Sequence, residues 1–242
     1  MSRSGVKSSQ YGAALMAVMI WLLIVTLLSV SAARLALQDR KALQDIRDRV
    51  TAFQAAEAAL LDGESDLDGS VPGNASRHSV FRSRRKGAML SPDGGSCNSG
   101  VGNITQGFCD TAIGAGPPVW LTIDLADRSD TTAVRYGRFT GQSMQTGNGA
   151  LPARLPRYLI EAISQQPVTG SDNAYRITAI GFGAREDNQV VLQSVFRQHA
   201  PGGAGVPAAP VGTVLRTGRL SWREISNWSE LRQQLLHGGS RP

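Results

Sequence analysis

The uncharged run AALMAVMIWLLIVTLLSVSAA, Ala13–Ala33, decides the fold of this chain. After Arg34 it continues as LALQDRKALQDIRDRVTAFQAAEAALL, and no proline or glycine occurs before Gly63. As an α-helix, the 49 residues from Ala13 to Leu61 would be about 74 Å long. The first 21 of them are enough to cross the roughly 30 Å hydrocarbon core of a bilayer.

The second half of this stretch is amphipathic. Large apolar residues recur at steps of three and four, which places them on one stripe of a helix: Leu43, Ile46, Val50, Phe53 and Leu60. We therefore predict one long helix over residues 13–62, with a transmembrane half over 13–33. A folded domain is expected to pack against the stripe of the other half.

Length and charge limit the remainder to one medium domain. The chain has 242 residues and a formal net charge of +6. Part of this excess is a basic cluster in one loop-like stretch, made of Arg82, Arg84, Arg85 and Lys86. Such a cluster is either a solvated loop or a surface for an anionic partner such as nucleic acid or lipid headgroups.

The first twelve residues, MSRSGVKSSQYG, are short, basic and free of acidic side chains. Basic residues before a membrane span hold that end in the cytoplasm, so the rest of the chain is expected on the other side. A secretory signal cleaved near Ala33 is the alternative, because Val30-Ser31-Ala32 satisfies a small-x-small rule. The length of the apolar run and its unbroken helical pattern argue against cleavage there.

Cys97 and Cys109 lie close together in a Gly/Ser/Asn-rich loop. Outside the cytoplasm they are expected to form a disulfide, and closing so short a loop would contribute about 3 kcal/mol. A zinc site is not expected, since two cysteines without a nearby histidine do not supply four ligands.

The rest of the chain has β patterns after a long irregular stretch from Asp62 to Gly116. We predict an α+β protein, in which a linker occupies Pro201–Pro210 and a short helix Glu230–Leu236. That helix would be capped by Ser226 or Ser229. The predicted strands are Val119–Leu125, Val134–Phe139, Arg157–Ser164, Ala174–Ile180, Gln189–Arg197 and an edge strand within Val211–Leu220.

No catalytic or cofactor-binding motif was found, so we predict no enzyme, no cofactor and no metal site. Glu64-x-Asp66-x-Asp68-Gly69 matches a calcium loop only in part, because Ala75 stands where the bidentate glutamate belongs. The three histidines, His78, His199 and His237, are interpreted as surface residues. Glu57 falls in phase with the apolar stripe and is expected to pair with Arg49 or with a basic residue of the sheet.

Several stretches resemble a known family. Gln10-Tyr11-Gly12 followed by the apolar run resembles the class III-type start of the type IV pilin superfamily. RDRVTAFQAAEAALLDGE (Arg47–Glu64), PRYLIEAI (Pro156–Ile163) and AYRITAIGFGAREDNQVVLQSVFR (Ala174–Arg197) are similar to PilX-like minor pilins. The stretch TGRLSWREI near the C-terminus also resembles these proteins, whereas residues 66–150 match nothing in them.

The resemblance implies a pilin-like fold, in which the long N-terminal helix packs on an antiparallel sheet. It implies a leader over residues 1–12, a periplasmic head over 63–200 and a C-terminal extension over 201–242. A prepilin peptidase would cut between Gly12 and Ala13 and methylate the amine of Ala13. Ala17 then stands where most pilins have a glutamate.

The missing glutamate has a physical meaning. A carboxylate in the bilayer is costly unless it meets a partner, and in major pilins it is taken to pair with the N-terminal amine of a neighbour. A subunit with Ala17 lacks this requirement and can be the first in the fibre.

The sequence therefore predicts a non-enzymatic minor pilin that primes type IV pilus assembly. It would be held in the inner membrane and then lie at the fibre tip, with other minor pilins and a tip adhesin as partners. Nucleic acid is not an expected partner. Two alternatives stay open: a tip pseudopilin of a type II secretion system, and a tethered DNA-binding module supported by the basic cluster alone.

Overall fold

The computed structural model describes residues 10–69, 77–83, 96–110, 117–163, 173–198 and 218–238. The chain forms two compact units, Met1–Arg47 and Asp48–Pro242, and each is described by itself. The leader, the linker Pro201–Pro210, Arg84, Arg85 and Lys86 lie outside the described residues, as does His199.

The helix α1 runs from Gln10 to Asp68 with no interruption near Ala33. It continues past Gly63, where we had expected it to end. A Cβ at Gly63 would lie 3.0 Å from Ile177 Cγ2 and 3.1 Å from Tyr158 Cδ2, closer than nearly all ordinary contacts. The glycine therefore serves close packing against the sheet and does not terminate the helix, although it lowers intrinsic helix propensity.

The second unit is a six-stranded sheet in the order β1-β3-β4-β5-β6, with β2 also paired to β3. The strands are β1 (Phe108–Asp110), β2 (Val134–Arg135), β3 (Arg157–Ile163), β4 (Asn173–Phe182), β5 (Gln189–Gln198) and β6 (Gly218–Glu224). The sheet is mixed, because β1 runs parallel to β3 while every other pair is antiparallel. The α+β, pilin-like fold class is confirmed, with one parallel pair where we had expected none.

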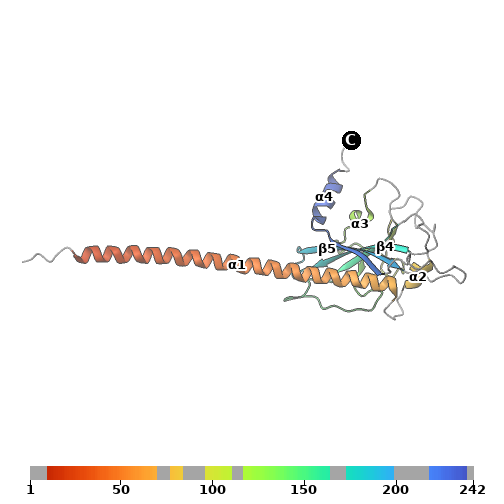
Figure 1. Ribbon diagram of the computed structural model, residues 1–242, viewed down its shortest axis with the longest axis horizontal. Coiled ribbons are helices and arrows are strands. Elements are labelled where there is room, and N and C mark those ends of the chain that lie inside the picture. The colour runs from red at the N-terminus through yellow and green to blue at the C-terminus, as the bar shows by residue number, and fades with distance from the viewer. Residues whose placement is uncertain are drawn as a thin grey trace, which may run out of the picture. The chain divides into compact units, whose positions relative to one another are not determined.

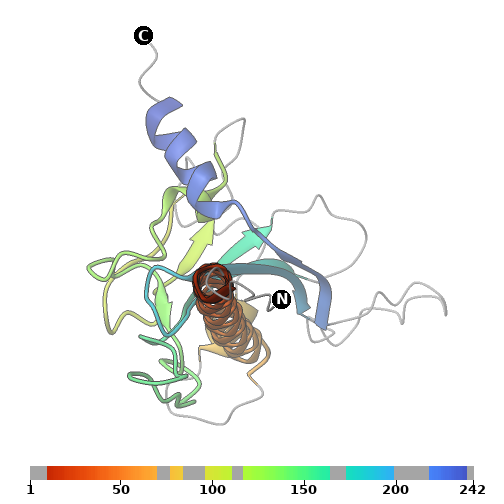
Figure 2. The ribbon, with the colours of Figure 1, turned by 90° about the vertical axis from the view of Figure 1, so that its left-hand side faces the viewer.

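The two faces of the sheet are covered differently. On one face, the part of α1 from Asp48 onward packs on a core that includes Tyr158, Ile177 and Leu192. On the other face, α3 (Val119–Thr122) and α4 (Trp228–Gly238) pack on Leu159, Val191 and neighbouring residues. Figure 1 shows the sheet between these two layers, and Figure 2 shows β6 at one edge of the sheet, with α4 following it in the chain. A short helix, α2 (His78–Ser83), adds Phe81 to the first core.

The strands β3, β4 and β5 confirm the predicted ones, including the antiparallel β4–β5 hairpin. The predicted strand Val119–Leu125 is wrong. Its first four residues form a helical turn that begins after the extended Pro118 and buries Val119, Trp120 and Leu121 together. Three consecutive apolar residues can share one core only through a turn, so packing here overrides β propensity.

Three other boundaries differ from the sequence prediction. Only Val134–Arg135 of the predicted strand Val134–Phe139 pairs with β3. The edge strand is Gly218–Glu224, whereas residues 211–217 of the predicted Val211–Leu220 lie outside the described residues. The last helix begins at Trp228, so Ser229 lies inside it and does not cap it.

Candidate functional site

The first unit presents an uncovered apolar helix surface. From Leu15 to Val30, its large apolar side chains are 43–71% exposed. The hydroxyls of Thr26, Ser29 and Ser31 donate to carbonyl oxygens three or four residues earlier in the same helix. By length and composition this helix is able to cross a membrane. The polar groups inside the run are thus satisfied without water, as a bilayer requires.

The predicted processing residues lie on this helix. Gly12 and Ala13 are in α1, and their side chains lie outside the described part. Ala17 is exposed, so no part of the described chain fills the space that a glutamate side chain would occupy at this position.

In the second unit, α1 contacts the sheet through small residues. The residues fully or nearly fully buried on this face are Ala52, Ala55, Ala56, Ala59 and Leu60. A Cβ at Gly181 of β4 would overlap the carbonyl oxygen of Ala52 and the amide nitrogen of Ala56. The helix and strand backbones therefore touch directly, and only glycine fits at this position.

The predicted apolar stripe is therefore only partly correct. Leu60 is buried and Phe53 is half-buried, but Leu43, Ile46 and Val50 are 56%, 60% and 48% exposed. The periodicity of large aliphatic residues identified a face that the folded domain does not cover. The face that it does cover is rich in alanines, which a hydrophobicity count underweights, and also includes Leu60 and Leu67.

Carboxylates on α1 fix the helix to the sheet. The first is Asp48, which is 7% exposed. It accepts hydrogen bonds from the Arg185 amide (3.2 Å), Arg185 Nε (3.1 Å) and Asn188 Nδ2 (3.1 Å). Burial raises the pKa of Asp48, but the hydrogen bonds from Arg185 and Asn188 outweigh it and lower the pKa below its usual value. The β4–β5 turn thus holds α1 at the start of the second unit.

A second set joins α1 to the edge strand β6. Arg219 Nη1 lies 2.8 Å from Glu57 Oε1, and Arg219 Nε lies 2.7 Å from Glu64 Oε1. Trp222 Nε1 donates to Glu57 Oε2 at 3.0 Å. Glu57 therefore pairs with a basic residue of the sheet, as predicted, while Arg49 pairs with Glu224 instead.

The third set is the most deeply buried. The Arg77 side chain is fully buried, and its Nη2 lies 2.7 Å from Asp66 Oδ2. Tyr158 Oη donates to the same oxygen at 3.0 Å. Arg77 also stacks 4.0 Å from the centre of the Phe139 ring and donates to the carbonyl oxygens of Ile104 and Gln106. One guanidinium thus connects the end of α1 to the loop before β1. Burial and the charge of Asp66 raise the pKa of Tyr158 well above its usual value.

Asp62 completes this region. It accepts hydrogen bonds from the Gly137 amide at 2.7 Å and from the Thr140 hydroxyl. No ion pair to Asp62 is seen among the described residues. Burial raises its pKa, and the hydrogen bonds from Thr140 and Gly137 offset only part of that effect.

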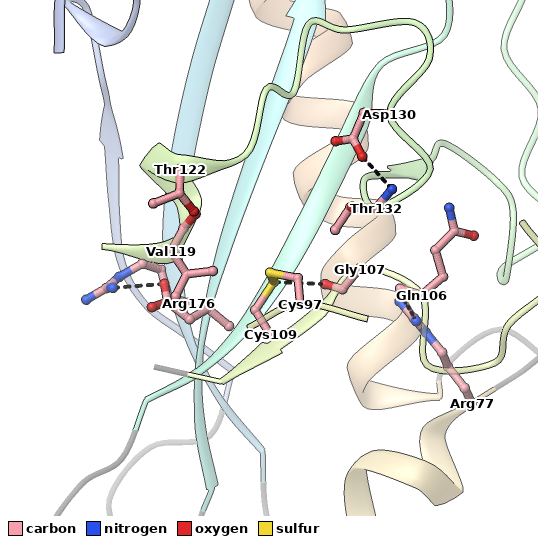
Figure 3. Close-up of a disulfide and its surroundings, with 11 residues drawn as sticks. Arg77, Cys97, Gln106, Gly107, Cys109, Val119, Thr122, Asp130, Thr132 and Arg176 are labelled. Carbon is pink, nitrogen blue, oxygen red and sulfur yellow. Dashed lines mark hydrogen bonds and ion pairs between the residues drawn. A yellow bond between two sulfur atoms is a disulfide. The ribbon is translucent and has the colours of Figure 1, made fainter. Parts of the chain in front are cut away.

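Cys97 and Cys109 form a disulfide, with their Cα atoms 4.0 Å apart. The two residues face each other across an antiparallel bridge, next to the start of the sheet (Figure 3). The loop that they close is held on its other side by Gln106, whose Nε2 donates to Thr131 O at 2.8 Å. The disulfide therefore stabilises the connection between the loop and β1.

In the partial calcium motif, Glu64, Asp66 and Asp68 all lie in α1. Glu64 and Asp66 are engaged by arginines. Within the described ranges, no three His, Cys, Asp or Glu side chains are grouped so that they could hold a metal ion. The prediction that His78 is a surface residue is wrong, because the side chain is half-buried and its Nδ1 lies 2.7 Å from Leu67 O. His237 is exposed, as predicted.

Part of the chain matches a known protein family. Residues 93–198 match the family described as type IV pilus assembly protein PilX, C-terminal. This range of the chain is similar to PilX. The matched range begins just before the disulfide and ends with the last residue of β5. Comparisons with curated proteins and with solved structures gave no significant match.

The match and the fold together describe a minor pilin related to type IV pilus assembly. Residues 66–150, which resemble nothing in the family, include the buried Arg77, the disulfide and β1. The cysteine pair was predicted from the sequence, whereas Arg77 and β1 were missed, because Arg77 is a single basic residue in a polar stretch and β1 has three residues.

Proposed function

We propose that this chain is a minor pilin that primes type IV pilus assembly and lies at or near the fibre tip. Its uncharged helix would hold it in the inner membrane, with the head in the periplasm, and would then exchange lipid for the helices of neighbouring pilins. Because lipid is as apolar as those helices, close packing would drive the exchange. Its work would be association and not catalysis.

The observation that carries the proposal is the helix surface itself. From Leu15 to Val30 the large apolar side chains of α1 are 43–71% exposed, whereas α1 from Asp48 onward packs on the sheet mainly through alanines. A soluble domain gains nothing from such a surface, whereas a subunit that is stored in lipid and then packed among like helices requires it. Ala17 supports the tip position, since a subunit without the carboxylate has no charge that must meet a subunit ahead of it.

The proposed partners are other minor pilins, a tip adhesin and the prepilin peptidase. The PilX match favours a pilus over the type II secretion alternative. The basic cluster that supported DNA binding lies at residues 82–86, of which the structure describes little, so that alternative gains no support from the fold.

The proposal is tested by deleting the gene for this chain from its host and counting surface fibres. We expect most fibres to be lost, and the wild-type chain to restore them. Ala17→Glu is expected to restore fewer, because its carboxylate would need an amine ahead of it, while Ala17→Ser serves as the matched control. Normal fibre numbers in the deletion strain would contradict a priming role. Ala17→Glu chains spread along fibres of normal number would contradict the tip position.

A further inference from the structure

Asn148 is the one asparagine of this chain that a glycine follows. The pair Asn148-Gly149 lies in the loop between β2 and β3, where residues 145–150 are all exposed. An Asn-Gly pair commonly forms the two-residue turn of a β-hairpin, with a positive φ at both residues. Here residues 141–156 contain no strand, and the φ of Asn148 is not positive. A hairpin turn therefore does not account for the pair.

The backbone around Asn148 has room to move. Gly149 has φ +94°, and a Cβ built on it would have no neighbour within 4 Å. Among the described residues, no hydrogen bond is made by the Asn148 side chain or by the Gly149 amide. The Gly147 amide donates to Pro152 O at 2.9 Å, which closes the loop around the pair. Asn148 and Gly149 thus form the free tip of a closed loop.

This arrangement favours attack of the backbone on the asparagine side chain. The Gly149 nitrogen, after losing its proton to base, attacks Cγ of Asn148, and ammonia leaves. The product is a five-membered succinimide ring, which water opens at either carbonyl to give aspartate or isoaspartate. Glycine suits the second position, because it has no side chain to shield the nitrogen or to restrict the backbone. An exposed tip gives water and base free access.

We propose that Asn148 is a site of spontaneous deamidation. In the overall reaction, the C–N bond of the side-chain amide breaks, water supplies the oxygen of the new C–O bond, and ammonia is released. The reaction needs no enzyme, metal ion or cofactor. The inference does not depend on the proposed function.

Three other asparagines with described side chains lack this combination of features. Asn103 accepts a hydrogen bond from the Thr105 amide at 3.0 Å, and Asn188 donates one to Asp48 at 3.1 Å. Asn227 immediately precedes α4. Isoleucine, glutamine and tryptophan follow these three asparagines, so a large side chain stands beside each nitrogen that would have to attack. They serve as internal controls.

Deamidation would give this loop its first charge, since residues 141–153 carry no charged side chain. The loop contacts α1 through the Thr51 hydroxyl, which donates to Ala150 O at 3.5 Å. A carboxylate at position 148 would lie two residues from this contact. Isoaspartate would also lengthen the main chain by one carbon atom there. The head of an aged chain would therefore differ from that of a new one in charge and in backbone.

Peptide mapping of the detergent-solubilised full chain tests the inference. The chain is aged in mildly alkaline or mildly acidic buffer and then digested with pepsin in acid, where the Gly149 nitrogen keeps its proton. We expect the peptide that contains residue 148 to gain the mass difference between an amide NH2 and a hydroxyl. The gain should be faster in alkaline buffer, and part of the product should be isoaspartate. Peptides that contain Asn103, Asn188 or Asn227 should keep their mass.

Two glycine variants test the chemistry. Gly149→Ala adds a Cβ beside the attacking nitrogen, and we expect it to slow deamidation severalfold. Gly147→Ala is the matched control, because Gly147 also has a positive φ, +130°, and no neighbour within 4 Å of an added Cβ. Its nitrogen precedes Asn148 and takes no part in the reaction, so the wild-type rate is expected.

An unmodified Asn148 in the aged wild-type chain would overturn the inference. Equal slowing by Gly149→Ala and Gly147→Ala would also contradict it, because only one of the two changes touches the attacking group. A product without isoaspartate would do the same, since direct hydrolysis of the side-chain amide by water yields aspartate alone.

Discussion

The two parts of α1 are apolar in different ways. Residues 14–47 carry large aliphatic side chains, and all of them are exposed. Residues 48–68 place alanines and Gly63 against the sheet and fix their carboxylates with basic and polar partners. The head is thus held by close backbone approach and by specific polar contacts. The large apolar residues of the first part are exposed and so are available to contact a membrane or other molecules.

The strongest test of how the second part of α1 is held is the buried ion pair between Arg77 and Asp66. Arg77→Met would leave Asp66 buried without its cation, which typically costs about 3–5 kcal/mol. We expect that loss in the free energy of unfolding, measured by chemical denaturation of the detergent-solubilised chain. The double variant Asp66→Asn with Arg77→Met should recover much of it. An Arg77→Met chain of unchanged stability would show that the end of α1 is held in some other way.

Close backbone approach is tested by one added methyl group. Gly181→Ala would drive a Cβ into the backbone of Ala52 and Ala56, and we expect it to cost about 3 kcal/mol. Gly149→Ala is the matched control, because that glycine has φ +94° but no neighbour within 4 Å of an added Cβ. Its cost should be limited to the backbone term of about 1–2 kcal/mol. Equal losses for the two variants would contradict direct contact between helix and strand.

The contrast between the two parts is sharpest at two exposed leucines. Leu23 is 61% exposed and Leu61 is 50% exposed. Leu23→Arg should cost about 2.5–3.5 kcal/mol of membrane insertion, whereas Leu61→Arg should not affect insertion. The measurement is the fraction of chain that resists alkaline extraction from membranes. Similar fractions for both variants would mean that residues 14–33 do not lie in lipid.

A smaller effect is expected at the start of the second unit. Asp48→Asn weakens charge-assisted hydrogen bonds to Arg185 and Asn188, for an expected loss of about 1–2 kcal/mol at neutral pH. Because the pKa of Asp48 is lowered in the folded state, its contribution is complete above the usual value of 3.8 and is lost as the pH falls below it. The difference from wild type should therefore shrink in acid. A difference that grows in acid would contradict the assignment.

Asp62 should behave in the opposite way, with the smallest effect. Its pKa is raised in the folded state, so wild-type stability gains as the pH falls from neutral toward 3.8. Asp62→Asn lacks that gain, so the advantage of wild type over the variant should grow as the pH falls over this range. Denaturation curves at several pH values measure it, and a constant difference would show that Asp62 titrates normally.

The sequence allowed us to predict the elements whose patterns are long and regular. The helix, the β3–β4–β5 strands and the cysteine pair were found because each has a strong local signal. The Val119–Thr122 turn was missed, because its β-rich composition yields to the need to bury three consecutive side chains. The alanine face was missed since it depends on Gly181, more than 100 residues away along the chain, which permits the close approach. Long-range fit of this kind leaves no periodic pattern.

The most direct test of the central claim is the mass of the mature N-terminal peptide, isolated from host membranes. The proposed minor pilin predicts a peptide that begins at Ala13 and carries one methyl group on its amine, with the apolar helix retained. A peptide that begins near Ala33, or an uncut chain that begins at Met1, would contradict it.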